Sequence, residues 1–343
     1  MYQLLKPLLF QLDAERAHTL GLKGMKAANS LGLMPLLRGV ADFRQPTTIK
    51  GLTFPNPIGL AAGLDKNGDY LEPLSKLGFG FIEVGTVTPR PQPGNPKPRL
   101  FRVKNKQAVI NRMGFNNEGV DHLIERLKGL QRTCPIGINI GKNFDTPNEK
   151  AMDDYIICLK KAFPSADYIV VNISSPNTKG LRDLQHKNEL SRLLEGLKNA
   201  HEDLKNSHKK DVPLMVKIAP DLTDVQIDEM AEVLLAHNID GCIATNTTLS
   251  RQGVENEPFG EEAGGMSGAP LLEKSTAVLQ KMQRLLGGKI PLIGVGGITG
   301  GEDARAKFKA GATLIQVYSG FIYRGPALIK EIVRSLQAGK STV

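Results

Sequence analysis

The feature that most constrains the fold of this chain is a regular alternation of short apolar runs with longer amphipathic stretches. The runs are nearly continuous and rich in Val, Ile and Leu, which is typical of parallel strands covered on both faces. We predict strands at residues 57–63, 81–85, 136–140, 168–173, 214–218, 242–246, 292–296 and 314–318. Helical periodicity marks residues 118–130, 148–162, 189–204, 224–237, 275–286 and 302–309. Eight such units favour an α/β fold of the (β/α)8 TIM-barrel type, with a doubly wound parallel sheet as the alternative.

Two long insertions interrupt the alternation. Residues 89–117 separate the second and third predicted strands, and residues 100–103 and 108–111 within them predict a small antiparallel hairpin. Residues 247–268 follow the sixth strand. Long loops in a compact domain are usually lids or binding elements, so both insertions are expected near a functional site.

The N-terminal segment differs from the repeating body. Leucines recur there at helical spacing, and Asp13 is a suitable N-cap for a second helix. Five basic residues outnumber two acidic ones in residues 1–38. Short, basic, Leu-rich helices suit an anionic membrane surface, although a cap packed on the main domain is the alternative. We therefore divide the chain into a helical, membrane-associating segment at 1–40 and a catalytic barrel at 41–343.

Composition narrows the function classes. The 44 Lys and Arg residues against 35 Asp and Glu give a net charge of +9, which suits an anionic substrate, an anionic membrane or nucleic acid. The absence of Trp weakens a base-stacking function. Three widely spaced cysteines argue against a disulfide framework and for a reducing compartment. No apolar run is long enough to span a bilayer, and no metal site has ligand spacing.

Polar residues end six consecutive predicted strands. Barrel active sites lie at these carboxyl ends, so amides, hydroxyls and two lysines are expected to meet there. Glycines and Ser319 follow the last two strands, where backbone N–H groups commonly bind phosphate. A phosphate next to a flat, amide-rich ring site indicates FMN. A hydrolase using Ser175 as nucleophile is less well supported, because only His186 falls near the required loop.

At these motifs the chain resembles the class 2, quinone-dependent dihydroorotate dehydrogenases of pyrimidine biosynthesis. The matching segments are residues 56–68, 83–95, 111–117, 137–142, 171–178 and 244–248. The resemblance implies that FMN is held by Ala61, Ala62, Gly63, Lys66, Thr86, Asn139, Asn172, Lys217, Thr245, Gly268, Gly296, Gly297, Tyr318 and Ser319. It implies that dihydroorotate is held by Lys66, Asn111, Arg112, Met113, Gly114, Phe115, Asn172, Asn177, Asn246 and Thr247.

The same resemblance implies a reaction. Ser175 removes the C5 proton of dihydroorotate, hydride from C6 passes to FMN, and orotate results, with Lys66 holding the carboxylate. A serine is a weak base, so Thr178 is assigned to a proton relay. Class 1 relatives use a cysteine as base, so Ser175 and the N-terminal extension both indicate class 2. In the family that extension shelters a quinone tunnel, for which His18, Arg102 and Tyr318 are the candidates.

The partners follow from this resemblance. We expect dihydroorotate and orotate, ubiquinone or menaquinone, peripheral contact with an anionic membrane, no nucleic acid, and a monomer. With no presequence ahead of Met1, a bacterial protein on the cytoplasmic face of the inner membrane is expected. Two alternatives remain: an FMN-dependent tRNA dihydrouridine synthase, which would use a cysteine as acid, and a non-catalytic, membrane-associated flavin-binding or phosphate-binding protein.

Overall fold

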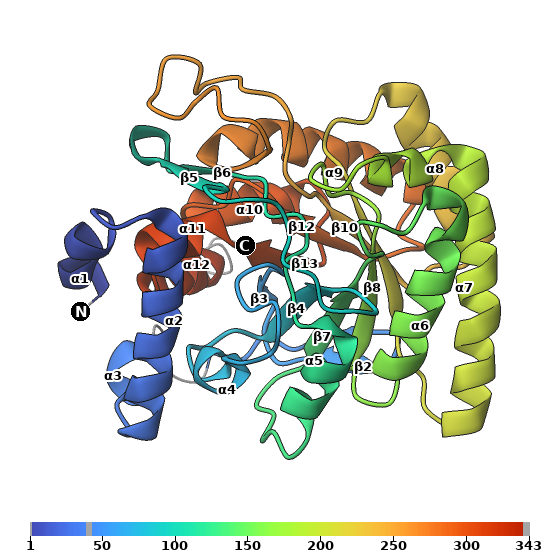
Figure 1. The fold of residues 1–343 in the computed structure, drawn as a ribbon, viewed down its shortest axis with the longest axis horizontal. Helices are drawn as coiled ribbons and strands as arrows, with labels where there is room; N and C mark the ends of the chain where they lie inside the picture. The colour runs from blue at the N-terminus through green and yellow to red at the C-terminus, as the bar shows by residue number, and fades with distance from the viewer. Residues whose placement is uncertain (1, 39–42, 339–343) are drawn as a thin grey trace.

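Eight parallel strands close into a barrel in the computed structural model, which describes residues 2–38 and 43–338 (Figure 1). In chain order the strands are β3 (Ile58–Leu60), β4 (Phe81–Val87), β7 (Ile136–Ile140), β8 (Tyr168–Asn172), β9 (Leu214–Ile218), β10 (Gly241–Ala244), β12 (Leu292–Val295) and β13 (Leu314–Val317). Every residue in them is buried, which explains why their sequences lack alternation. The prediction of a TIM barrel is confirmed, and the doubly wound sheet is wrong because the strands form a closed ring in which the last strand, β13, pairs with the first, β3.

Helices surround this barrel. The larger ones are α5 (Gly119–Leu127), α6 (Ala151–Ala162), α7 (Lys187–His208), α8 (Asp224–Ala236), α9 (Leu272–Leu286), α10 (Gly301–Lys309) and α12 (Ala327–Ala338). All six predicted helices are present. Shorter helices and 3-10 turns join them, namely α4 (Leu71–Ser75), α11 (Ser319–Arg324), η1 (Lys104–Lys106), η2 (Asn148–Lys150), η3 (Leu181–Gln185) and η4 (Ala269–Leu271). One apolar core lies between the strands and these helices.

A short hairpin closes the amino end of the barrel. It consists of β1 (Thr47–Ile49) and β2 (Leu52–Phe54), which were not predicted. Phe54 packs edge-on against Phe81 at a centroid distance of 5.2 Å, and both belong to an apolar cluster inside the barrel. Because apolar side chains fill this end, a site for ligands is left at the carboxyl end.

A three-stranded sheet covers part of the carboxyl end. The predicted hairpin is confirmed as β5 (Leu100–Val103) and β6 (Ala108–Asn111). Its third strand, β11 (Gly265–Gly268), pairs antiparallel with β6 and was expected to be loop. The two long insertions therefore meet in one sheet.

Three helices precede the barrel: α1 (Tyr2–Leu9), α2 (Ala14–Ser30) and α3 (Met34–Leu37). Asp13 caps α2 as predicted, because its carboxylate accepts from the N–H groups of Glu15 and Arg16. The three helices stand at one side of the barrel, where they contact α4, β5 and α11 (Figure 1). The boundary predicted between residues 40 and 41 lies outside the described residues.

Candidate active site

One cavity at the carboxyl end of the barrel brings together most of the predicted site residues. Its empty volume, including the part open to solvent, is about 980 Å³. The predicted residues that line it are Ala61, Ala62, Gly63, Lys66, Thr86, Asn111, Met113, Gly114, Phe115, Asn172, Ser175, Asn177, Lys217, Thr245, Asn246, Thr247, Gly268, Gly296, Gly297, Tyr318 and Ser319. The lining also contains residues that the sequence did not single out, namely Ser267, Leu271, Val295, Ile298, Gln316, Val317 and Gly320.

A buried carboxylate, Glu83, organises the floor of this cavity. It accepts hydrogen bonds from Asn139 Nδ2 at 2.7 Å and Gln316 Nε2 at 2.6 Å, and Lys217 Nζ lies 3.7 Å from it. Glu83 thus forms an ion pair with Lys217 and orients two amides. It was missed as a site residue, although an acid in the middle of a buried strand was a usable signal.

Asn139 does not line the cavity but supports two residues that do. Its Oδ1 accepts from the hydroxyl of Thr86 and, at 3.1 Å, from Nδ2 of Asn172. Nδ2 of Asn172 also donates to Thr86 Oγ1 at 2.9 Å. This triangle of β4, β7 and β8 side chains therefore fixes the polar groups that face the cavity.

Ser175 lies on the loop after β8, among amides. The side chain is buried, and its hydroxyl accepts from the backbone N–H of Asn177 at 3.2 Å. Asn177 Nδ2 in turn donates to Asn111 Oδ1 at 3.1 Å. No histidine or carboxylate is hydrogen-bonded to Ser175 in the described part of the chain, so a Ser-His-Asp triad is absent there. Asn246 completes the cluster by donating to Ser174 Oγ at 3.0 Å.

Two predicted residues adjoin this cluster without lining the cavity. Thr178 is buried, and its hydroxyl has no hydrogen-bond partner among the described residues. Arg112 directs its guanidinium at Glu262, 2.7 Å away, and over the ring of Phe101. Its backbone remains near the site, because the flanking residues Asn111 and Met113 both line the cavity.

Lys66 supplies positive charge at the cavity wall. Burial lowers the pKa of Lys66 to about 8; Arg99 acts in the same direction, while Glu15 and Asp65 oppose it. The ammonium form therefore predominates at pH 7, but only by a modest margin. An anion placed beside it would stabilise that form.

Glycines permit close approach of the backbone at the other end of the cavity. Gly297 has φ +83°, and a Cβ there would overlap Leu272, so a side chain is excluded on two grounds. Nearby, the hydroxyls of Ser267 and Ser319 are 2.7 Å apart. Backbone N–H groups and hydroxyls gathered in this way suit an oxyanion such as phosphate.

The three quinone candidates occupy different places. Tyr318 lines the cavity. Its ring lies close to Gly63, because a Cβ added to that glycine would be 3.3 Å from the ring. His18 on α2 faces Lys66 and the backbone of Leu64, and burial together with Lys66 lowers its pKa to about 4. His18 is therefore neutral at pH 7 and lies next to the site, although it does not line the cavity.

Arg102 is the third candidate, on β5. It donates to the carbonyls of Leu9 and Leu12 and stacks over the ring of Phe10 at 4.7 Å. It therefore anchors the turn between α1 and α2 to the sheet that covers the cavity. Arg102 is not among the residues that line the cavity.

The described residues hold neither a metal centre nor a membrane-spanning helix. Within residues 2–38 and 43–338, no group of three or more His, Cys, Asp or Glu side chains is placed to hold a metal ion. In the same ranges, no helix is both long and apolar enough to cross a bilayer.

Comparison with known proteins identifies the family. A family model described as dihydroorotate dehydrogenase matches residues 45–339. Proteins named dihydroorotate dehydrogenase (quinone) from Acinetobacter baylyi and Nitrosomonas eutropha are 58% and 57% identical, covering 98% and 99% of this chain and 99% and 98% of their own. A crystal structure of the Eimeria tenella enzyme DHODH in complex with ferulenol has a TM-score of 0.86 and 40% identity, covering 95% of this chain and 92% of that one. The chain belongs to the dihydroorotate dehydrogenase family.

Proposed function

We propose that this chain is a class 2 dihydroorotate dehydrogenase, which oxidises dihydroorotate to orotate with FMN as cofactor and a membrane quinone as final acceptor. The observation that carries the proposal is the union, in one cavity, of Ser175, an amide cluster, Lys66 and a glycine-lined anion site. The curated relatives of similar length are named as quinone-dependent enzymes of this kind. The reaction is a step of pyrimidine biosynthesis.

The residues present fit a flavin mononucleotide. Gly296, Gly297 and Ser319 offer backbone N–H groups and a hydroxyl to the phosphate. Deeper in the cavity, the buried Oε1 of Gln316 has no hydrogen-bond partner in the described part of the chain, which suits a ring donor. Lys217, held by Glu83, provides positive charge for the ring. When bound, FMN supplies the acceptor for hydride from C6 of dihydroorotate and delivers electrons to quinone.

The substrate is held by charge and by amides. Lys66 pairs with the carboxylate of dihydroorotate, which keeps the lysine protonated. Asn111, Asn172, Asn177 and Asn246 bind the amide edges of the pyrimidine, each as both donor and acceptor. The buried hydroxyl of Thr247 lacks a partner among the described residues, and it is available to a ligand.

Ser175 acts as the base that takes the C5 proton. Its hydroxyl accepts from Asn177 N–H and carries its own proton, so that proton must leave as the new one arrives. Thr178 is three residues on, buried and without a partner in the described ranges. It relays this proton by accepting it, directly or through water, while releasing its own hydroxyl proton to water. The paired loss of a proton from C5 and hydride from C6 leaves the C5–C6 double bond of orotate.

The N-terminal helices form the quinone entrance and the membrane contact. This segment exposes large apolar side chains, which is unfavourable in water unless another apolar surface covers them. The side chains are between 65% and 80% exposed at Leu4, Leu8, Leu31 and Leu36. Basic residues on the same helices suit anionic lipid. The protein is then peripheral on the cytoplasmic face of a bacterial inner membrane. Vesicle flotation with anionic lipid tests this: loss of flotation in Leu4→Ser/Leu8→Ser supports it, and unchanged flotation contradicts it.

Acceptor preference tests the proposed class. With dihydroorotate as donor, ubiquinone or menaquinone should support turnover, whereas fumarate and NAD should not. Efficient turnover with fumarate would assign the chain to class 1. The protein is proposed to act as a monomer, so sedimentation of the active holoenzyme should give the mass of one chain.

A further inference from the structure

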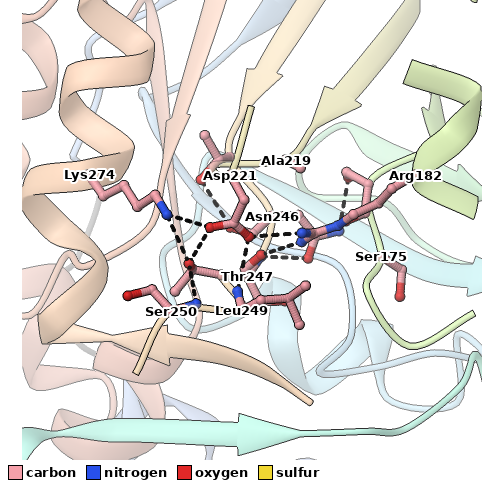
Figure 2. Close-up of polar contacts among 12 residues, drawn as sticks. Ser175, Arg182, Ala219, Asp221, Asn246, Thr247, Leu249, Ser250 and Lys274 are labelled. Carbon is pink, nitrogen blue, oxygen red and sulfur yellow. Dashed lines mark hydrogen bonds and ion pairs between the residues drawn. The ribbon is translucent and has the colours of Figure 1, made fainter. Parts of the chain in front are cut away.

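Arg182, on η3 seven residues beyond Ser175, joins the loops that follow three successive barrel strands. Its Nε donates to the carbonyl of Ser174 at 3.0 Å, in the loop after β8. Its Nη1 donates to Asp221 Oδ2 at 2.8 Å, in the loop after β9. Its Nη2 donates to the carbonyl of Thr247 at 2.8 Å, after β10. Figure 2 shows this guanidinium between the Ser175 loop and the Asp221 carboxylate.

Asp221 is itself fixed from the opposite side. Its carboxylate accepts from the hydroxyl of Thr248, from the N–H of Leu249 at 2.9 Å, and from Lys274 Nζ on α9 (Figure 2). Burial alone would raise the pKa of Asp221, but the bonds from Lys274, Thr248, Leu249 and Arg182 together lower it to about 2. Asp221 is therefore anionic across the physiological range.

The ion pair of Arg182 and Asp221 is largely buried, which restricts its motion. The side chains of Arg182 and Asp221 are 19% and 18% exposed, in contrast to the exposed pair Arg192–Glu189 on α7. A planar guanidinium with three acceptors in fixed directions has little freedom to move. Neither side chain is among the residues that line the cavity, so neither is placed to touch substrate or cofactor.

The two carbonyls that Arg182 binds flank the reacting groups. Ser174 directly precedes Ser175, the proposed base, and Thr247 follows Asn246, a proposed substrate ligand. Side chains from the same two loops also meet, since Asn246 Nδ2 donates to Ser174 Oγ at 3.0 Å. The separation between base and substrate ligands therefore depends on how these two loops are held together.

We propose that Arg182 and Asp221 are positioning residues, which clamp the Ser175 loop to the Asn246–Thr247 loop. The clamp holds the base at the right distance from a substrate bound by Asn246 and Thr247. This inference rests on the proposed function only for the identity of the reaction. Misplacing a reacting group by about 1 Å costs roughly 10²-fold in rate. The clamp accordingly affects the proton-abstraction half-reaction and leaves quinone reduction unaffected.

The test compares Arg182→Met holoenzyme with wild type in rapid mixing. Flavin reduction by dihydroorotate should slow by roughly 10²-fold, while reoxidation by quinone stays within about twofold. Arg192→Met, which removes an arginine from an exposed pair, should change neither rate. Equal slowing of both half-reactions in Arg182→Met would overturn the proposal, as would no slowing at all.

A double substitution separates positioning from general destabilisation. In a Ser175→Ala background the base is already lost, so Arg182→Met should slow flavin reduction by less than about threefold further. Full additivity would contradict action through Ser175. Arg182→Lys keeps the charge but not the three-way fork, and it should recover only part of the rate.

Amide hydrogen exchange measures how firmly the two loops are held, and it does not depend on catalysis. Arg182→Met and, to a smaller extent, Asp221→Asn should speed exchange in both residues 173–181 and 246–250. Unchanged exchange in these segments would overturn the clamp. If wild-type flavin is not reduced by dihydroorotate, the proposed function fails, yet this exchange result still decides whether the clamp exists. Asp221→Asn gives the same readout should Arg182→Met fail to fold.

Discussion

Glu15 on α2 forms a two-point ion pair with Arg99 in the insertion after β4. Arg99 Nη2 lies 2.8 Å from one carboxylate oxygen, and Nε lies 3.2 Å from the other. The same guanidinium donates to the carbonyls of Pro93 and Asn95. The N-terminal helices are thereby tied to a loop that borders the cavity, because Asn95 Nδ2 reaches the carbonyl of Arg112 at 2.9 Å.

Glu15→Gln should therefore weaken the quinone site selectively. The side chains of Glu15 and Arg99 are both mostly buried. Loss of the charge pair should therefore weaken the packing of the N-terminal helices on the barrel by about 1–2 kcal/mol, which corresponds to a rise of roughly 5- to 30-fold in quinone KM. Steady-state kinetics with varied quinone at about pH 6 measures this, and flavin reduction by dihydroorotate serves as the internal control. The pH is set below the Lys66 pKa because Glu15 also helps to keep that lysine protonated. A rise in KM for dihydroorotate with unchanged quinone KM would contradict the assignment of these helices to quinone access.

Ser175→Ala should separate the two half-reactions. Removal of the base is expected to slow flavin reduction by about 10²- to 10⁴-fold, since that is the usual contribution of a positioned base. Quinone reoxidation of chemically reduced flavin should be nearly unchanged. Comparable damage to both steps would mean that another group takes the C5 proton.

Orotate binding should weaken as pH rises through about 8. The pKa of Lys66 in the free site is lowered to about 8, chiefly by burial, so the ammonium that attracts the carboxylate is present below that pH and lost above it. Titration of the flavin spectrum with orotate between pH 6 and 10 measures the Kd at each pH. In Lys66→Met the affinity should be low and almost independent of pH. A wild-type Kd that stays flat through pH 8 would contradict the role given to Lys66.

Gly297→Ala should release the cofactor. A methyl group there meets Leu272 in a backbone conformation with φ +83°, and the segment must shift away from the phosphate position. Gly288→Ala is the matched control, since φ is +76° but nothing lies within 4 Å of its Cβ. Both should lose about 1–2 kcal/mol from the left-handed conformation, and only Gly297→Ala should lose bound FMN as well. Retention of FMN by both variants would place the phosphate elsewhere.

Much of the fold could be predicted because buried parallel strands carry a strong local signal. The runs at β7 and β9 were placed to the residue, since each is apolar apart from one polar residue, Asn139 or Lys217, and sharply bounded. The hairpin of β1 and β2 was missed because each strand has three residues and is only partly buried. β11 was missed because its sequence, Gly265–Gly268, has no β-propensity, and it is a strand only through pairing with β6.

The candidate site was predictable to a similar degree for a different reason. Strand ends converge in any barrel, so Lys66, Thr86 and Asn172 were expected to meet before their distances were known. The supporting contacts were not predictable, because the Arg182–Asp221 pair joins loops 39 residues apart, and that pairing depends on strand order. Asn139 stays a predicted cofactor residue, and its bonds to Glu83, Thr86 and Asn172 could not be read from the sequence either.

Dihydroorotate oxidation by the bound flavin is tested by anaerobic mixing of the purified holoenzyme with dihydroorotate, followed by addition of quinone. The visible absorbance of the flavin should bleach as one equivalent of orotate forms, and quinone should then restore it. A flavin that keeps its absorbance with excess dihydroorotate would show that this chain does not oxidise dihydroorotate.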